Sequence, residues 1–167
     1  MKLLYRSEKK PNTESATLPF SVEQFSPSLL RGYFRKGEKK NPKTGFVRFY
    51  FQLMTLGKAR LFYAVSEKGE VMHSSYVVPR CFKFPFLKKG DYIIGPCFTQ
   101  PEFRGQGIYP KVLSKILAQM GNEQTVFYMS VDENNTPSVR GIEKAGFKRC
   151  GSVEKSRILK RYRLSDK

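Results

Sequence analysis

The sequence predicts a mixed α/β or α+β fold in a single domain, and three observations support this. The chain has 167 residues, which is close to the usual length of one domain and enough to bury a core without disulfides or metals. Hydrophobic residues make up 40% and charged residues 27%, a balance that is typical of globular proteins and excludes collagen, coiled coil and global disorder. Strand-like segments come first, and helix-like and strand-like segments then alternate, as in a sheet covered by helices.

The first third of the chain has the least regular pattern. Residues 21–34 carry apolar side chains at helical spacing, which predicts a helix, although Pro27 interrupts the pattern. Residues 36–45 combine glycine, proline and charges without an apolar period, which predicts a loop. Residues 46–54 are aromatic and apolar and fit either a strand or a helix.

The middle of the chain is predicted to form strands. Residues 60–66 and 71–78 are rich in β-branched and aromatic side chains, and residues 67–70 between them are typical of a hairpin turn. Pro79 ends the second of these strands. After a basic and aromatic connection, residues 91–99 form a short apolar run that predicts another strand.

The last third contains the clearest helical pattern. Apolar side chains fall on one face of a helix over residues 108–120, and residues 125–131 then read as a strand. Asn135 is followed by Thr-Pro-Ser, which predicts the N-cap of a second, shorter helix. Residues 147–164 predict two strands or an extended hairpin that turns around residues 154–155.

The charge is strongly basic. Lysine and arginine number 31 against 14 acidic residues, which gives a formal net charge of +17 and favours polyanionic partners: nucleic acid, an anionic membrane or a phosphate-bearing small molecule. The three cysteines lack metal-ligand spacing, so neither a disulfide framework nor a metal site is expected. No apolar stretch is long enough for a transmembrane span, and the N-terminal apolar run is too short for a signal peptide, so a cytoplasmic location is expected.

A glycine-containing loop, residues 100–107, joins the strand 91–99 to the helix 108–120. Glycines at such a junction let the backbone approach a ligand, and the free N–H groups of the first helical turn favour an anion, phosphate above all. Arg104 can add a charge-assisted hydrogen bond. The spacing fits neither the Walker loop nor the dinucleotide-binding fingerprint.

Two motifs in the same order resemble the GNAT acetyltransferase family. The first is the phrase PEFRGQGI over residues 101–108, and the second begins at Asn135 with NTPS and ends at residues 143–147 with EKAGF. The resemblance is specific over residues 91–151. It implies a GNAT-like α+β single domain with a central, mostly antiparallel, twisted sheet that is splayed between two strands and flanked by helices. The segments FKFPF, DYIIGPCFT and GIYP further resemble acetyltransferases found with bacterial surface-polysaccharide genes.

The resemblance implies three parts within the domain over residues 1–167: an acceptor side at about 1–90, an acyl-CoA-binding core at about 91–151 and C-terminal strands at about 152–167. Acetyl-CoA would lie in the gap between the strands 91–99 and 125–131. No metal would be involved.

The resemblance also implies which residues hold acetyl-CoA. The pantetheine arm would pair with the backbone of Cys97, Phe98 and Thr99, and a backbone N–H near Phe98 would bind the thioester carbonyl. Asn135 and Ser138 would line the same channel. The pyrophosphate would be held by Arg104, Gly105, Gln106, Gly107, Ile108 and Tyr109.

The sequence departs from the family pattern at two positions. Glu102 stands where the loop usually begins with Gln or Arg, so phosphate binding would depend more on Arg104 and on backbone amides. Ile142 stands where many members carry a tyrosine acid. Cys97 lies where the thioester would sit, and a small buried thiol is favoured there over an acyl-cysteine route.

The catalytic candidates are therefore few. His73, the only histidine, and Glu133, at the end of a strand beside the gap, are candidates for the base. Tyr128 is the preferred candidate for the acid, with Tyr76 and Tyr109 as alternatives. Structural roles compete with the catalytic role for each of them.

The preferred function is transfer of an acetyl group from acetyl-CoA to an amine, on an amino sugar or another small anionic acceptor, by direct attack on the thioester. The basic, aromatic segment 80–89 could line the acceptor entrance. One alternative is a nucleic-acid-binding module that keeps the fold without catalysis, and another is a protein or peptide N-acetyltransferase. The oligomeric state is left open, with a dimer among the options.

Overall fold

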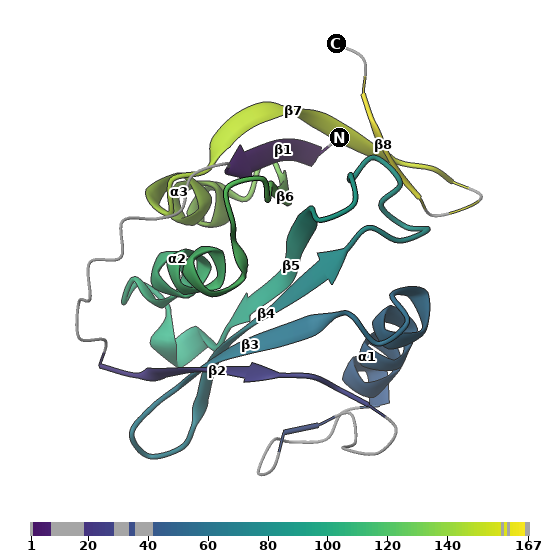
Figure 1. Ribbon diagram of the computed structural model, residues 1–167. Coiled ribbons are helices and arrows are strands. Elements are labelled where there is room, and N and C mark those ends of the chain that lie inside the picture. The colour runs from purple at the N-terminus through teal and green to yellow at the C-terminus, as the bar shows by residue number, and fades with distance from the viewer. Residues whose placement is uncertain are drawn as a thin grey trace.

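The protein forms one eight-stranded mixed sheet with helices on both faces (Figure 1). The computed structural model describes residues 2–7, 19–28, 34–35, 42–157, 159 and 161–165. The strands follow the spatial order β2-β3-β4-β5-β6-β1-β7-β8, and neighbouring strands are antiparallel except β5 and β6. The strands are β1 Lys2–Ser7, β2 Ser21–Phe25, β3 Arg60–Val65, β4 Val71–Pro79, β5 Tyr92–Thr99, β6 Phe127–Asp132, β7 Lys148–Lys155 and β8 Tyr162–Leu164. This confirms the predicted fold class, including the splayed sheet.

The helices divide between the two faces of the sheet (Figure 1). Helix α1 (Pro42–Met54) lies on one face, and α2 (Ile108–Met120) and α3 (Thr136–Lys144) lie on the other. A short 3-10 helix, η1 (Pro101–Phe103), precedes α2. The apolar stripe predicted for α2 is buried in the core: Ile108, Val112, Leu113, Ile116 and Leu117. In the described part of the chain no helix is long and apolar enough to cross a membrane.

Strand β1 lies in the sheet interior, between β6 and β7, although no strand was predicted there. Leu3, Leu4 and Tyr5 are buried, and β1 pairs antiparallel with both neighbours along its length. The apolar run is short and flanked by charges, so its local pattern does not reveal that two partners distant in sequence enclose it. At one end of the β1–β6 pairing Lys2 lies opposite Asp132, and at one end of the β1–β7 pairing Arg6 lies opposite Lys148.

Three local predictions are wrong or incomplete. The helix expected over 21–34 is wrong at its start, because residues 21–25 form β2 and pair with β3; residues 29–33 lie outside the described part. The loop expected over 36–45 ends early, because α1 begins at Pro42 and residues 36–41 are not described. The C-terminal strands are present, but β7 continues through Lys155, so the connection to β8 begins after Lys155 rather than at 154–155.

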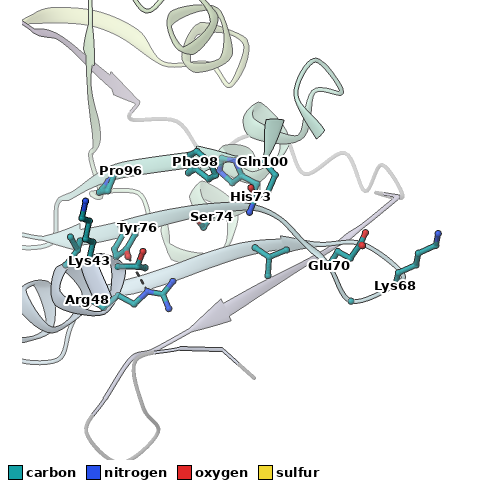
Figure 2. Close-up of a pocket in the computed structure, with 14 residues that line it drawn as sticks. Lys43, Arg48, Lys68, Glu70, His73, Ser74, Tyr76, Pro96, Phe98 and Gln100 are labelled. Carbon is teal, nitrogen blue, oxygen red and sulfur yellow. Dashed lines mark hydrogen bonds between the residues drawn. The ribbon is translucent and has the colours of Figure 1, made fainter. Parts of the chain in front are cut away.

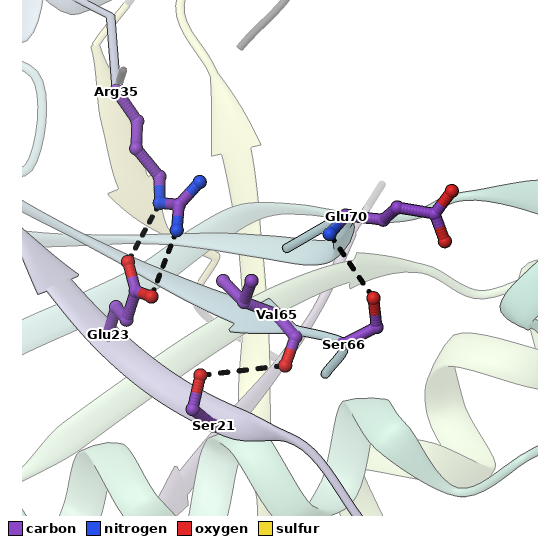
Figure 3. A network of polar contacts seen from close by, with 6 residues as sticks. All are labelled: Ser21, Glu23, Arg35, Val65, Ser66 and Glu70. Carbon is purple, nitrogen blue, oxygen red and sulfur yellow. Dashed lines mark hydrogen bonds and ion pairs between the residues drawn. The ribbon is translucent and has the colours of Figure 1, made fainter. Parts of the chain in front are cut away.

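The edge formed by β2 and β3 is held by polar contacts (Figure 3). Arg35 donates from Nε to Glu23 Oε2 over 2.7 Å and from Nη2 to Glu23 Oε1 over 2.9 Å. The hydrogen bonds from Arg35 lower the pKa of Glu23. Ser21 Oγ donates to the carbonyl of Val65, which adds a contact between the two strands.

Candidate active site

The two parallel strands β5 and β6 separate soon after they begin. Their pairing consists of Tyr92 with Phe127 and Ile93 with Tyr128, whereas β5 stays paired with β4 as far as Thr99. The edge of β5 beyond Ile93 is therefore not paired with β6, and the two strand backbones are separated there. This confirms the predicted splay.

A bulge in β5 lies where the gap opens. Val77 of β4 is opposite Ile94, whereas Ser75 is opposite Cys97, so β5 contains one more residue than β4 over this interval. The extra length falls at Gly95 and Pro96, which are joined by a cis peptide bond; Gly95 has a φ of 141°. A proline has no N–H to donate, and a bulge redirects the strand, so the backbone after Pro96 can present groups to a ligand.

The loop before α2 has the shape that its glycines allow. Gly105 and Gly107 have φ values of 78° and 71°, which residues with a side chain rarely adopt. A Cβ on either glycine would meet no atom within 4 Å, so the requirement is conformational and the surrounding space is open. Arg104 is anchored by a 3.1 Å hydrogen bond from Nε to the carbonyl of Thr99, and its guanidinium lies 5.8 Å from the ring centroid of Phe98. Gln106 Nε2 likewise donates to a loop carbonyl, 3.2 Å away.

The second predicted motif forms the start of α3 as expected. Asn135 is the N-cap, and its Oδ1 accepts a hydrogen bond from the backbone N–H of Ser138 over 3.3 Å. Gly146 has a φ of 86° just after the helix, as a C′ glycine does. The structure thus shows a capping role for Asn135, and its predicted contact with the pantetheine arm stays a prediction.

A chain of polar side chains links β4 and β5 beneath α2. His73 Nδ1 lies 2.7 Å from Thr99 Oγ1, and His73 Nε2 lies 2.7 Å from Ser75 Oγ. Ser75 Oγ in turn donates to Cys97 Sγ over 3.2 Å. Because the hydroxyl of Ser75 donates to sulfur, it accepts from His73, which places the imidazole proton on Nε2 and leaves Nδ1 to accept from Thr99.

Burial determines the protonation states of His73 and Cys97 in this hydrogen-bonded row of side chains. Burial lowers the pKa of His73 to about 4, so the imidazole is neutral at pH 7. Burial also raises the pKa of Cys97 to about 11, although the hydrogen bond from Ser75 acts in the opposite direction. A thiol with this pKa is a poor nucleophile at neutral pH, which favours the structural interpretation of Cys97 over an acyl-cysteine route.

Tyr109, which the sequence offered as an alternative acid and as part of the phosphate loop, places its phenol between the two separated strands. Its ring lies 5.4 Å from that of His73, and its hydroxyl lies 4.0 Å from Met129 Sδ on β6. Burial raises its pKa, and its proximity to Cys97 raises it further. A Cβ at Gly141 would lie 2.5 Å from the Tyr109 ring, so the glycine in α3 makes room for it.

The three predicted catalytic residues do not form one cluster. His73 is 1% exposed and lies on the α2 face, where both of its ring nitrogens are hydrogen-bonded. Tyr128 lies on the α1 face at the closed end of the gap, with its ring 5.8 Å from that of Phe86. Glu133 is exposed in the turn that follows β6. Only Glu133 of the three is freely accessible to solvent.

A cavity of about 710 Å³ lies beside α1 and the bulge of β5, and His73 is one of the residues that line it (Figure 2). None of its lining residues comes from segment 80–89, where Phe84 and Leu87 are instead buried in the core. At its base, buried Arg48 donates from Nε to the hydroxyl of Tyr76 over 3.3 Å. The polar side chains around it include three cations and one carboxylate: Lys43, Arg48, Lys68 and Glu70.

The comparisons with known proteins agree with this geometry. The model described as the acetyltransferase (GNAT) family matches residues 28–147. A GNAT-family acetyltransferase from Colwellia psychrerythraea is 20% identical with a TM-score of 0.61, and the alignment covers 89% of this chain and 52% of that chain. A protein assigned to the same family from Novosphingobium aromaticivorans is 15% identical with a TM-score of 0.54, and the alignment covers 89% of this chain and 60% of that chain.

A protein assigned as an acetyl transferase from Pyrococcus furiosus is 15% identical with a TM-score of 0.53, and 83% of this chain and 99% of that chain are covered. At these identities the structural matches establish the fold alone. This chain spans about half the length of the Colwellia protein. The comparison with curated proteins finds no match.

Proposed function

Because the chain belongs to the acetyltransferase (GNAT) family, we propose that it transfers an acetyl group from acetyl-CoA to the amine of a small anionic acceptor, with an amino sugar as the favoured class. The observation that carries the proposal is the gap between β5 and β6, which opens directly beside the glycine loop that begins α2. A pantetheine arm can pair with the free edge of β5 while the phosphates reach the amides of the loop.

The residues present fit acetyl-CoA, which supplies the acetyl thioester. The open space around Gly105 and Gly107 leaves room for a pyrophosphate against the backbone, and Arg104 adds a positive charge nearby. Cys97, Phe98 and Thr99 offer backbone groups on the gap side of β5. The amine of the acceptor attacks the thioester carbonyl, a new C–N bond forms, the C–S bond breaks and the thiolate leaves.

Two protons move in this reaction, one from the amine and one to the departing thiolate. Glu133 is accessible at the end of β6 and can take the first through water, whereas His73 is buried and too weakly basic to do so at neutral pH. Tyr109 is the acid that the geometry favours over Tyr76 and Tyr128, because its hydroxyl lies between Cys97 and Met129 in the gap. Its raised pKa keeps the phenol protonated and able to donate.

The cavity beside α1 is the proposed acceptor site. It adjoins Pro96 and Phe98, where the acetyl group would emerge, and its volume suits a small molecule. Lys43, Arg48 and Lys68 outnumber Glu70 around it, which favours an acceptor with a carboxylate or phosphate group.

The proposal is tested by calorimetric titration with acetyl-CoA at physiological salt. We expect saturable one-site binding that is lost in Gly105→Asp, because the new carboxylate would lie beside the phosphates. Gly90→Asp is the matched control, since Gly90 also has a positive φ, 97°, and open surroundings but lies away from the loop. Failure of acetyl-CoA to bind, with salt-sensitive binding of a single-stranded oligonucleotide, would replace the proposal with a nucleic-acid function. An acetylation screen of anionic amino sugars then identifies the acceptor.

A further inference from the structure

Helix α1 buries two polar side chains, Arg48 and Gln52, together with the apolar Phe51. Arg48 contacts Tyr76, and Gln52 Nε2 donates to the carbonyl of Ala59 over 3.1 Å. Thr55, directly after the helix, donates to the carbonyl of Phe51 over 2.7 Å and is also buried. An amphipathic surface helix normally places such residues toward water and its apolar stripe toward the core.

The solvent-exposed side of α1 is apolar. Phe46, Phe49 and Leu53 are 68%, 45% and 56% exposed, and their spacing of three and four residues places them on one side of the helix. Leu56, just past the end, is 85% exposed. The only charged residue between positions 44 and 57 is Arg48, which is buried, so no charge interrupts this exposed apolar side.

The conformation of Leu56 adds an independent observation. Its φ is 50°, the only positive value for a non-glycine residue in the described part of the chain. Bulky side chains disfavour this region, and glycine or asparagine is the usual choice at the end of a helix. The chain thus keeps a large apolar side chain in a strained conformation and in full contact with solvent, which points to a role outside the folded monomer.

Basic residues flank the apolar side. Exposed Lys43 lies at the start of α1, and Lys58 and Arg60 follow its end. The described segment 42–60 contains no acidic residue. A partner for this surface therefore has to be apolar where the helix touches it and anionic around the contact.

We propose that α1 docks the protein on an anionic lipid surface. Phe46, Leu53 and Leu56 enter the boundary between headgroups and acyl chains, and the flanking cations contact anionic headgroups. A second copy of the chain is a poorer partner for the same face, because each copy carries a net charge of +17 and the two repel. Docking of this kind is independent of acetyl transfer, although Lys43 and Arg48 also line the candidate acceptor cavity.

Co-sedimentation of the full chain with lipid vesicles tests the proposal. We expect binding to vesicles of phosphatidylcholine mixed with phosphatidylglycerol and little binding to phosphatidylcholine alone. Replacing Phe46 and Leu53 together by serine weakens partitioning by about a hundredfold, at about tenfold for each half-inserted side chain. Leu164→Ser is the matched control, because Leu164 is 55% exposed on β8, the edge strand at the opposite end of the sheet from β2, and the change leaves the charge unaltered.

Three results would overturn the proposal. The first is no binding to anionic vesicles. The second is equal binding by the wild type and the Phe46→Ser/Leu53→Ser variant, which would reduce the effect to adsorption by net charge. The third is concentration-dependent dimerisation that the same variant abolishes, measured by analytical ultracentrifugation without lipid, which would assign the surface to a second copy. Circular dichroism and acetyl-CoA titration verify that both variants remain folded.

Discussion

Protonation of His73 should make the stability of the protein fall between pH 7 and pH 5. The side chain is 1% exposed, and burial lowers its pKa from 6.5 to about 4. Because the unfolded chain binds the proton first, the stabilisation is complete above the unfolded pKa and is lost as the pH falls from 6.5 toward 4. The difference of about 2.5 pH units corresponds to about 3 kcal/mol in full, and linkage gives a loss of about 2 kcal/mol between pH 7 and pH 5.

Urea unfolding at a series of pH values measures this loss, and His73→Gln is the variant for comparison. The chain has one histidine, so the wild type should lose about 2 kcal/mol more over this interval than the variant does, whatever the variant's own stability. Equal pH dependence in the two proteins, or an imidazole that titrates near 6.5 by NMR, would show that His73 is solvated and that its hydrogen bonds to Thr99 and Ser75 are absent.

Four further outcomes are expected. Tyr109→Phe should lower kcat with little change in the Kd of acetyl-CoA, because the ring stays and only the proton donor is lost; an unchanged kcat contradicts its role as acid. Gly107→Ala should weaken acetyl-CoA binding at a cost of about 1 kcal/mol for the left-handed backbone, and unaltered affinity argues against the loop as the phosphate site. Asn135→Ala should reduce the free energy of unfolding by about 1 kcal/mol through loss of the cap, as measured in urea. Glu23→Gln should leave stability at pH 7 nearly unchanged, since the exposed pair with Arg35 contributes little, and should remove the part that the wild type loses as pH falls below 4.5.

The second half of the chain was predictable from sequence because its signals are local. The one-sided apolar pattern of α2, the cap at Asn135 and the glycine that follows α3 each depend on residues a few positions apart, and all three are present in the structure. The first half depends on partners distant in sequence. β1 is a strand because it pairs with β6 and β7 on either side. β2 is a strand because it pairs with the edge of β3, and this pairing overrides the helical spacing of apolar residues over 21–25.

The candidate site was predictable in the same uneven way. The backbone conformation of the loop and of β5 could be predicted from the sequence motifs, because glycine positions and the order of the strands constrain the main chain directly. Side-chain roles do not follow, since they depend on which face of the sheet a residue occupies. His73 and Tyr128 looked equally available in the sequence, yet one is buried beneath α2 and the other packs on the α1 face.

The mixed character of α1 explains why residues 46–54 could be read as either a strand or a helix. A periodicity argument assumes that only the side facing the core is apolar, and here both sides carry aromatic residues while Arg48 and Gln52 are buried beside Phe51. The two faces of the sheet also differ in the functions proposed for them. The α2 face holds the groups that would bind one invariant donor, so its residues follow a recognisable pattern. The α1 face holds the cavity proposed to select the acceptor and the apolar side proposed to bind a membrane. These functions depend on individual side chains and not on a sequence motif.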